Sequence, residues 1–284
     1  MFLAENQQIG RLPWAHLRLR PFPQIALRVV HLANKEDVPL HILSGLIASD
    51  PAFAAEVLTV ANSPLFAPRT PADSVFQAVA RMGTRNVQGL CLAVGVRAFL
   101  GRSLSQPATR AVWHHNLACA VIAERIATRS SLDKDIAFTS GLMHDIGRLA
   151  LVVFQPDEYT ALLETFAGTA ASLLDREREL FGFDHCEAGR QLIGAWRLPP
   201  SFEPVVTEHH SARKASATWQ MTALTSVSCR MADCLGHAAF AGCRAPAYQE
   251  LLAEIPAPER VRLPATAEQL AEEVRERIHN VESA

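Results

Sequence analysis

The sequence predicts an all-α protein made of a bundle of short helices, a second bundle of longer helices and a C-terminal helical extension. Apolar residues recur at helical spacing through most of its 284 residues, whereas alternation with a period of two and Asn-Gly or Asp-Gly turns are scarce. Hydrophobic residues make up 49% of the chain and charged residues 20%, which is typical of a folded soluble domain. This length allows one large domain or two small ones.

The helices expected in the first half are short, and several begin or end at recognisable residues. Pro23 lies in the first turn of one helix, Asp50-Pro51 supplies the N-cap and first residue of another, and Ser63-Pro64 ends it. Gly83 interrupts the apolar pattern that starts near Asp73. The expected helices cover residues 22–34, 40–48, 51–62, 73–82 and 87–100.

A stretch that contains Pro107, residues 104–110, is the best candidate for a boundary. We expect an N-terminal helical subdomain over residues 12–105, a second helical subdomain over 106–240 and a C-terminal part over 241–284. Longer helices are expected at residues 111–129, 135–154, 157–167, 170–181, 184–196, 201–210 and 217–236.

The C-terminal part combines a proline-containing linker with an amphipathic helix. Residues 241–264 carry four prolines and are expected to form a loop with short turns, and Thr266 opens a capping-box pattern. The apolar stripe of the following helix is expected to pack on its own domain, with a homodimer or partner contact as the alternative. This stripe consists of Leu270, Val274, Ile278 and Val281.

Charge and cysteine content argue against several classes of protein. A formal charge of −2 gives no electrostatic reason to expect nucleic-acid binding, although residues 78–87 could be read as a helix-turn-helix. The six cysteines form no Cys-x-x-Cys pair, so we expect buried thiols in a reducing compartment. There is no signal-peptide pattern, and we expect no membrane span because charges interrupt each apolar run. The protein is therefore expected to be cytoplasmic, without a membrane partner.

A histidine and an aspartate stand side by side in an apolar run, residues 141–151. The apolar positions around His144 and Asp145 have the spacing of a buried helix face. Adjacent residues on a helix are about 100° apart, so an imidazole and a carboxylate could converge there on one divalent ion such as Zn, Fe, Mn or Ni. The alternative is a satisfied buried pair, with the histidine bonded to a backbone carbonyl and the aspartate bonded to Arg148.

Further residues of metal-binding type occur on other expected helices. Each is weak evidence alone, but side chains from several helices can form a site at the centre of a helical bundle. Asp184 is instead expected to be an N-cap. The residues of metal-binding type are His114, His115, His185, His209, His210 and Asp233.

His115, His144-Asp145 and Asp233, in this order, resemble the H…HD…D signature of the HD superfamily of metal-dependent phosphohydrolases. The resemblance is closer to the HDOD branch, the HD-related output domain of bacterial signalling proteins, and covers roughly residues 12–211. The segments that carry it are Pro21-Phe22-Pro23, Asp50-Pro51, Ala61-Asn62-Ser63, residues 78–83, 113–118, 141–151 and 179–185, Gly189, residues 196–199 and His209-His210.

The resemblance implies an N-terminal helical subdomain packed on an HD-type bundle, with one or two divalent ions and no other cofactor. In active HD enzymes one ion is held at the positions of His115, His144, Asp145 and Asp233. A second ion, with Asp145 as a bridge, is held at those of His185, His209 and His210. If the chain is an enzyme, the resemblance makes Asp145 and Arg148 its catalytic residues, with Asp145 polarising a metal-bound water.

Departures from the related HD-GYP cyclic-di-GMP phosphodiesterases argue against that activity. Those enzymes have a lysine at the position of Arg148, whose rigid fork is not equivalent to an ammonium. They have Gly-Tyr-Pro after the paired histidines, where this chain has residues 211–215. A glutamate that is a ligand in some polynuclear sites is Ala111 here.

Two functions therefore compete. We expect a signal-transduction module that acts through contact with a signalling protein, with a retained metal site that stabilises its core. The alternative is a metal-dependent phosphohydrolase acting on a nucleotide or another phosphoester. An enzyme would need an open coordination position and a phosphate-sized pocket, whereas a module would need neither.

Overall fold

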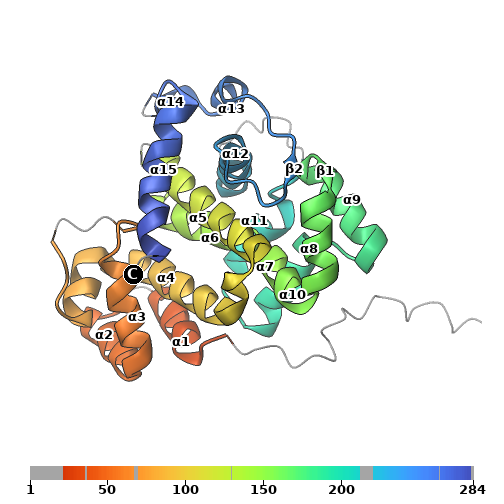
Figure 1. Ribbon diagram of the computed structural model, residues 1–284. Coiled ribbons are helices and arrows are strands. Elements are labelled where there is room, and N and C mark those ends of the chain that lie inside the picture. Colours follow the sequence, from red (N-terminus) through yellow and green to blue (C-terminus); the bar gives the residue numbers. More distant parts are fainter. Residues whose placement is uncertain are drawn as a thin grey trace, which may run out of the picture.

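The computed structural model describes residues 22–35, 37–66, 70–128, 130–211, 220–261 and 263–282, and all structural statements concern these residues. Helices dominate this part of the chain, and its one sheet consists of two strands of two residues each. The predicted all-α class is therefore confirmed. Figure 1 shows the N-terminal helices (red and orange) at the lower left, the middle of the chain (yellow to green) across the centre and right, and the C-terminal elements (blue) at the top.

Four helices of the described residues form the N-terminal bundle; side chains cap two of them, and Pro23, expected in the first turn, instead precedes the first helix. Asp50 caps the third helix by accepting hydrogen bonds from two backbone N–H groups, and Ser74 caps the fourth by accepting one from the backbone N–H of Gln77. The first three helices all pack against the fourth. The helices are α1 (Gln24–Ala33), α2 (Leu40–Ala48), α3 (Pro51–Ala61) and α4 (Val75–Leu100).

Helix α4 is bent at Gly83, whose φ of 78° is readily adopted only by glycine. The predicted interruption at this residue is confirmed, although helix continues beyond it. Every residue from Val87 to Val96 is buried, so this segment has no free face to place in a DNA groove. Its burial argues against the helix-turn-helix interpretation.

The second bundle is organised around α5 (Pro107–Ala127), which follows the short 3₁₀-helix η2 (Gly101–Ser105). Helix α5 packs most extensively against α6 (Lys134–Met143) and α12 (Met221–Cys234). Pro107 starts α5 at the position where its missing N–H is tolerated. The predicted boundary at residue 105 falls between η2 and α5, and the division into subdomains stays a prediction because one apolar core runs through both halves.

The prediction of a single helix over residues 135–154 is wrong, because the structure has two helices there. Helix α6 ends at Met143, and α7 (Ile146–Phe154) begins after two intervening residues. One of these, Asp145, has φ −105° and ψ 25°, which lies outside the helical region. His144 and Asp145 therefore occupy a turn between helices rather than the shoulder of one helix.

The next elements follow in the expected order. Helix α10 packs on α7, and the two backbones come so close that a Cβ on Gly147 would lie 1.9 Å from the carbonyl oxygen of His185. The helix expected at 201–210 is a 3₁₀-turn and a shorter helix. These elements are α8 (Pro156–Thr165), α9 (Ala170–Phe181), α10 (His185–Ala195), η3 (Pro200–Phe202) and α11 (Glu203–Glu208).

Residues 241–264 are more regular than the predicted loop. Strand β2 (Gly242–Cys243) pairs in parallel with β1 (Ala167–Gly168), and a Cβ on Gly242 would lie 2.4 Å from the carbonyl oxygen of Phe166. Two short helices follow, α13 (Tyr248–Glu254) and α14 (Ala257–Arg260). The paired strands hold this segment beside the connection between α8 and α9.

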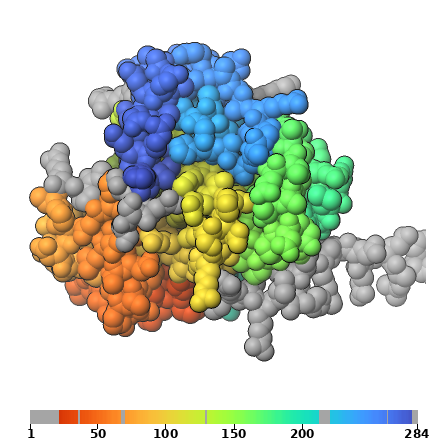
Figure 2. All heavy atoms as spheres, in the orientation of Figure 1, coloured from red at the N-terminus to blue at the C-terminus, as the bar shows by residue number. Residues whose placement is uncertain are grey.

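Helix α15 (Ala267–Glu282) packs along α5, which confirms that its apolar stripe is used within its own domain. Leu270, Val274 and Ile278 are at most 3% exposed, and the side chain of Val281 lies outside the described residues. Arg277 donates from Nη1 to Glu124 (2.6 Å) and from Nε to the carbonyl oxygen of Leu65 (3.0 Å). In Figure 2 this blue helix lies directly above the orange N-terminal bundle, which it helps to join to the rest of the chain.

Two helical segments are long and apolar enough to cross a membrane by length and composition, Val75–Ser105 and Lys134–Phe154, and the bent pair α2–α3 is a third candidate. The prediction that charges keep every apolar run short of a membrane span was therefore wrong. In the two longer segments, 67% and 89% of the most apolar window is buried inside the fold. Packing in the protein core accounts for this apolar composition.

Candidate metal centre

The interior of the second bundle holds a group of polar side chains from four regions of the chain. Except for His210, which is partly exposed, these side chains are at most 2% exposed. Such burial requires each polar group to have a partner. The group consists of His115 on α5, His144 and Asp145 between α6 and α7, His185 at the start of α10, and His209 and His210 at the end of α11.

A first cluster is formed by His115, His144 and Cys229. The Nδ1–H of His115 donates to the carbonyl oxygen of His237 (2.8 Å), and that of His144 donates to the carbonyl oxygen of Gly141 (2.6 Å). Each ring therefore carries a lone pair on Nε2, and these two nitrogens face each other at 3.3 Å. The Sγ of Cys229 lies 3.5 Å from Nε2 of His115. Two facing lone pairs in a buried site require a proton or a cation between them.

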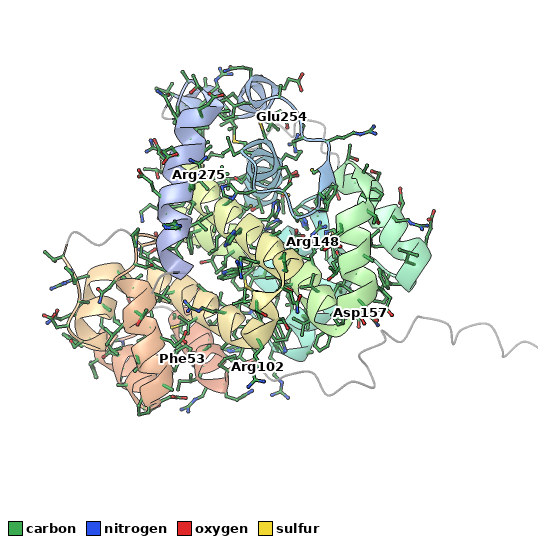
Figure 3. The ribbon with its side chains drawn as sticks, in the orientation of Figure 1. Phe53, Arg102, Arg148, Asp157, Glu254 and Arg275 are labelled. Carbon is green, nitrogen blue, oxygen red and sulfur yellow. The ribbon has the colours of Figure 1, made fainter. Side chains whose placement is uncertain are left out.

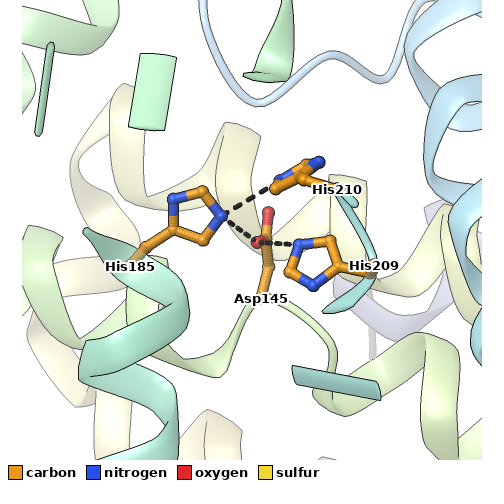
Figure 4. A group of neighbouring side chains, drawn as sticks. All are labelled: Asp145, His185, His209 and His210. Carbon is orange, nitrogen blue, oxygen red and sulfur yellow. Dashed lines mark hydrogen bonds and ion pairs between the residues drawn. The ribbon is translucent and has the colours of Figure 1, made fainter. Parts of the chain in front are cut away.

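A second cluster is formed by Asp145, His185, His209 and His210 (Figure 4). Oδ1 of Asp145 lies 3.2 Å from Nε2 of both His185 and His209, and Nε2 of His210 lies 3.0 Å from that of His185. His209 donates its Nδ1–H to backbone carbonyls of the preceding turn, so its Nε2 faces Asp145 as an acceptor. Burial lowers the pKa of His209 and holds the pKa of His210 well below its usual value, which favours the neutral forms that bind metals.

Asp145 belongs to both clusters through its two oxygens. Oδ1 faces the second cluster, whereas Oδ2 lies 3.7 Å from Nε2 of His144 and 3.8 Å from Nε2 of His115. Burial acts to raise the pKa of Asp145, but the Arg148 guanidinium, with His144 and His185, holds this pKa well below its usual value. The carboxyl group is therefore ionised, as a bridging ligand must be.

Arg148 places a positive charge inside the second cluster. Its Nε donates to Oδ2 of Asp145 (2.7 Å), and its Nη2 lies 3.2 Å from Nε2 of His185 and 3.5 Å from Nε2 of His210. Arg148 is 1% exposed, and Figure 3 shows it in the interior, whereas Arg102 lies at the surface. The bond between Arg148 and Asp145 and the bond of His144 to a backbone carbonyl are the two contacts expected if His144 and Asp145 are buried polar residues satisfied without a metal.

Glu177 on α9 is a buried carboxylate that the sequence analysis missed. It accepts hydrogen bonds from the Tyr159 hydroxyl (2.6 Å) and from Nδ1 (2.7 Å) and the backbone N–H (2.9 Å) of His185. Burial and the Arg148 charge act to lower the pKa of His185, but Glu177 and Asp145 outweigh them and raise it well above its usual value. Glu177 lies in a charged run, residues 175–179, and its spacing of four from buried Leu173 was the only signal of its burial.

The structure does not bring Asp233 into either cluster. Its Oδ1 lies 3.3 Å from Nδ1 of His115, whereas His144 and Cys229 approach the Nε2 side of that ring. Burial raises the pKa of Asp233. Cys229, which the sequence analysis also missed, precedes Asp233 by four residues on α12, and this spacing puts both on one helix face.

The donor spacings show which cluster fits a divalent ion. Two nitrogens bound to one tetrahedral zinc at about 2.0–2.1 Å are roughly 3.3–3.4 Å apart, and the facing nitrogens of His115 and His144 match this distance. In the second cluster, the Arg148 guanidinium already contacts three of the four ligand side chains, Asp145, His185 and His210. A divalent ion roughly 4 Å from that charge would be repelled by about 8 kcal/mol at an effective dielectric constant near 20. Among the described residues around the first cluster, Arg148 contacts only the shared carboxylate of Asp145, so this cluster fits an ion better than the second, where Arg148 also contacts two histidines.

Comparison with known proteins supports the fold and gives the family. An HDOD protein of unknown function from Geobacter sulfurreducens is similar in structure, with a TM-score of 0.68 and 24% identity over 94% of this chain and 92% of the other. A candidate phosphohydrolase from Shewanella amazonensis SB2B has a TM-score of 0.66 and 21% identity, covering 94% of each chain. Both likenesses concern the fold.

Matches to sequence are consistent with this fold. An uncharacterized protein of Treponema pallidum (strain Nichols) is 25% identical over 201 residues, which are 68% of this chain but only 38% of that protein. The HDOD domain model matches residues 19–212, more than half of the sequence. The chain therefore belongs to the HDOD family.

Proposed function

We propose that the chain is a regulatory module that acts by contact with a signalling protein, and that one divalent ion in the first cluster stabilises its core. The observation that carries this proposal is the state of Asp145, which is 0% exposed and bonded through Oδ2 to Arg148. A hydrolase would need this carboxylate beside a reactive water and a substrate phosphate. A buried carboxylate that is paired with an arginine suits a structural role.

Two hollows on the described surface lie away from the polar centre. One of about 430 Å³ lies between α8 and α9, and one of about 330 Å³ lies between α6, α11 and α12. No residue of either cluster lines these hollows. A phosphoester bound in either of them would therefore not reach Asp145.

The metal would be held by the first cluster and by the adjoining oxygen of Asp145. There it would supply a positive charge between two lone pairs that otherwise repel each other. Because these ligands come from segments far apart in the sequence, the binding energy of the ion adds to the free energy of unfolding. Zn, Fe, Mn and Ni all accept such nitrogen donors.

The partner, the location and the assembly state are part of the same proposal. We propose a protein partner rather than a nucleic acid or a membrane, and a cytoplasmic location, where all six cysteines stay free, as they are in the structure. A homodimer is compatible with this role, but α15, the helix first considered for such a contact, already packs on α5.

A phosphoesterase screen tests the proposal. Wild type and Asp145→Asn, each loaded with Zn, Fe, Mn or Ni, would be assayed on bis(4-nitrophenyl) phosphate and 4-nitrophenyl phosphate. We expect equal background hydrolysis, and a thermal midpoint that falls in the variant because a buried pair is broken. Metal-dependent turnover in the wild type that Asp145→Asn abolishes would establish the alternative, a phosphohydrolase acting on a nucleotide or another phosphoester.

A further inference from the structure

The first cluster contains a sulfur donor that the family signature does not include. Cys229 on α12 is 1% exposed, and its Sγ lies 3.5 Å from Nε2 of His115. The ligand atoms of His115, His144 and Cys229 all lie within 4.8 Å of one another. Oδ2 of Asp145 borders the same region, at 3.7 and 3.8 Å from the two imidazole nitrogens. Two nitrogens, one sulfur and one oxygen therefore meet in one buried place.

The orientation of both rings prepares these atoms for an ion. His115 and His144 each give the Nδ1–H to a backbone carbonyl, which fixes the ring and leaves Nε2 as an acceptor. A nitrogen at about 2.05 Å and a sulfur at about 2.3 Å from one tetrahedral zinc are roughly 3.5 Å apart. The distance between His115 and Cys229 has this value, so neither side chain must move to share an ion.

The carboxylate of Asp233 lies on the wrong side of His115 to share that ion. It approaches Nδ1 (3.3 Å), whereas the facing lone pairs lie on the Nε2 side of the ring. A carboxylate at this position orients a ligating histidine and increases its basicity. The structure thus gives Asp233 the part of a supporting residue and gives the ligand position to Cys229.

We propose that the metal site consists of His115, His144, Asp145 and Cys229, with a thiolate at the position that the family signature gives to Asp233. The inference rests on the metal-containing core proposed above. A thiolate with two imidazoles favours zinc over manganese, because manganese prefers oxygen ligands. Four protein ligands also close the coordination shell, as in structural zinc sites, which agrees with a module rather than a hydrolase.

Cobalt(II) substitution of the full chain tests this ligand set directly. Wild type loaded with cobalt should show the near-ultraviolet sulfur-to-cobalt charge-transfer band, and Cys229→Ala should lose it. Cys91→Ala, which removes another fully buried thiol in the N-terminal bundle, should keep the band, and so should Asp233→Asn. Metal content measured by mass spectrometry and helicity by circular dichroism accompany each spectrum, with Cys229→Ser as the second variant if the alanine does not fold.

The outcomes separate this inference from the proposal on which it rests. Bound cobalt without a charge-transfer band, or a band that survives in both Cys229 variants, would overturn the thiolate ligand and leave a metal-containing core. Loss of cobalt in Asp233→Asn but not in Cys229→Ala would return the ligand position to Asp233. A wild type that takes up neither cobalt nor zinc would overturn both proposals.

Discussion

Replacing Arg148 by methionine tests whether this side chain serves as the built-in cation of the second cluster. Methionine keeps much of the length but removes the charge, and it leaves Asp145 buried without its partner at 2.7 Å. Breaking a buried ion pair in this way costs about 3–5 kcal/mol. In a chain of this size, that loss lowers the thermal midpoint by roughly 6–10 °C. The comparison is made in chelator, so that no metal contributes.

The same substitution should create a second metal site. Oδ1 of Asp145 and the nearest ring nitrogens of the three histidines lie within 4.8 Å of one another, and the guanidinium competes with an ion for two of these nitrogens. Mass spectrometry after loading with zinc and desalting should therefore find one more equivalent in Arg148→Met than in the wild type. Free zinc at 100 times the dissociation constant should restore about 2.7 kcal/mol of stability.

Two further variants sharpen the result. Arg102→Met removes an exposed arginine and should change neither stability nor metal content. Adding Asp145→Asn to Arg148→Met removes both charges, so the double variant should lose less than the sum of the two single losses. An Arg148→Met protein that is as stable as the wild type in chelator, or that binds no additional zinc, would refute the reasoning.

Three other predictions follow from packing and charge. Gly147→Ala brings a Cβ to 1.9 Å from the carbonyl oxygen of His185 and should lower the free energy of unfolding in urea by about 3 kcal/mol or more; its control, Gly194→Ala, has open space and should change it by less than about 1 kcal/mol. Burial lowers the pKa of His237 to about 4, so the folded state resists protonation. The contribution of neutral His237 to the free energy of unfolding should be fully present above pH 6.5 and should be lost as the pH falls from 6.5 toward 4. Urea titrations over this pH range should show a smaller loss in His237→Asn than in the wild type. Val274→Asp puts an unpaired carboxylate between α15 and α5, and hydrogen exchange should accelerate in α15 but not in α6; equal exchange in both would contradict this account.

The helix starts that the sequence predicted correctly depend on contacts within one turn. Asp50 and Asp184 accept hydrogen bonds from the backbone of the helices they precede, and Pro107 opens the longest helix of the second bundle. Such caps can be predicted because the residues involved are close together in the sequence. The break after Met143 could not be predicted in this way, because the apolar spacing continues through it. The approach of Gly147 to α10 in this region is a contact between segments about forty residues apart.

The candidate site shows the same limit. The histidines and Asp145 were identified because ionisable residues on several apolar helices are unusual, and the structure brings them into the two clusters except for His114 and Asp233. Cys229 gave no such signal, because a cysteine in an apolar helix is ordinarily a small buried side chain. Glu177 resembled its exposed neighbours. The rotation of each helix about its own axis, relative to the helices packed against it, decides which of these side chains points into the buried polar centre.

The two clusters differ in where their positive charge comes from, and Asp145 connects them. In the second cluster the positive charge is the side chain of Arg148, which is bonded to Asp145. A chelator cannot remove this charge, because Arg148 is part of the chain. In the first cluster the nitrogens of His115 and His144 face each other at 3.3 Å, and on the proposal made above a bound ion supplies the charge between them. On that proposal, metal supply changes the free energy of unfolding through the first cluster, whereas the charge in the second cluster is always present. On this proposal, a chain can keep almost every ligand of an HD-type centre and yet hold its central carboxylate away from any phosphoester.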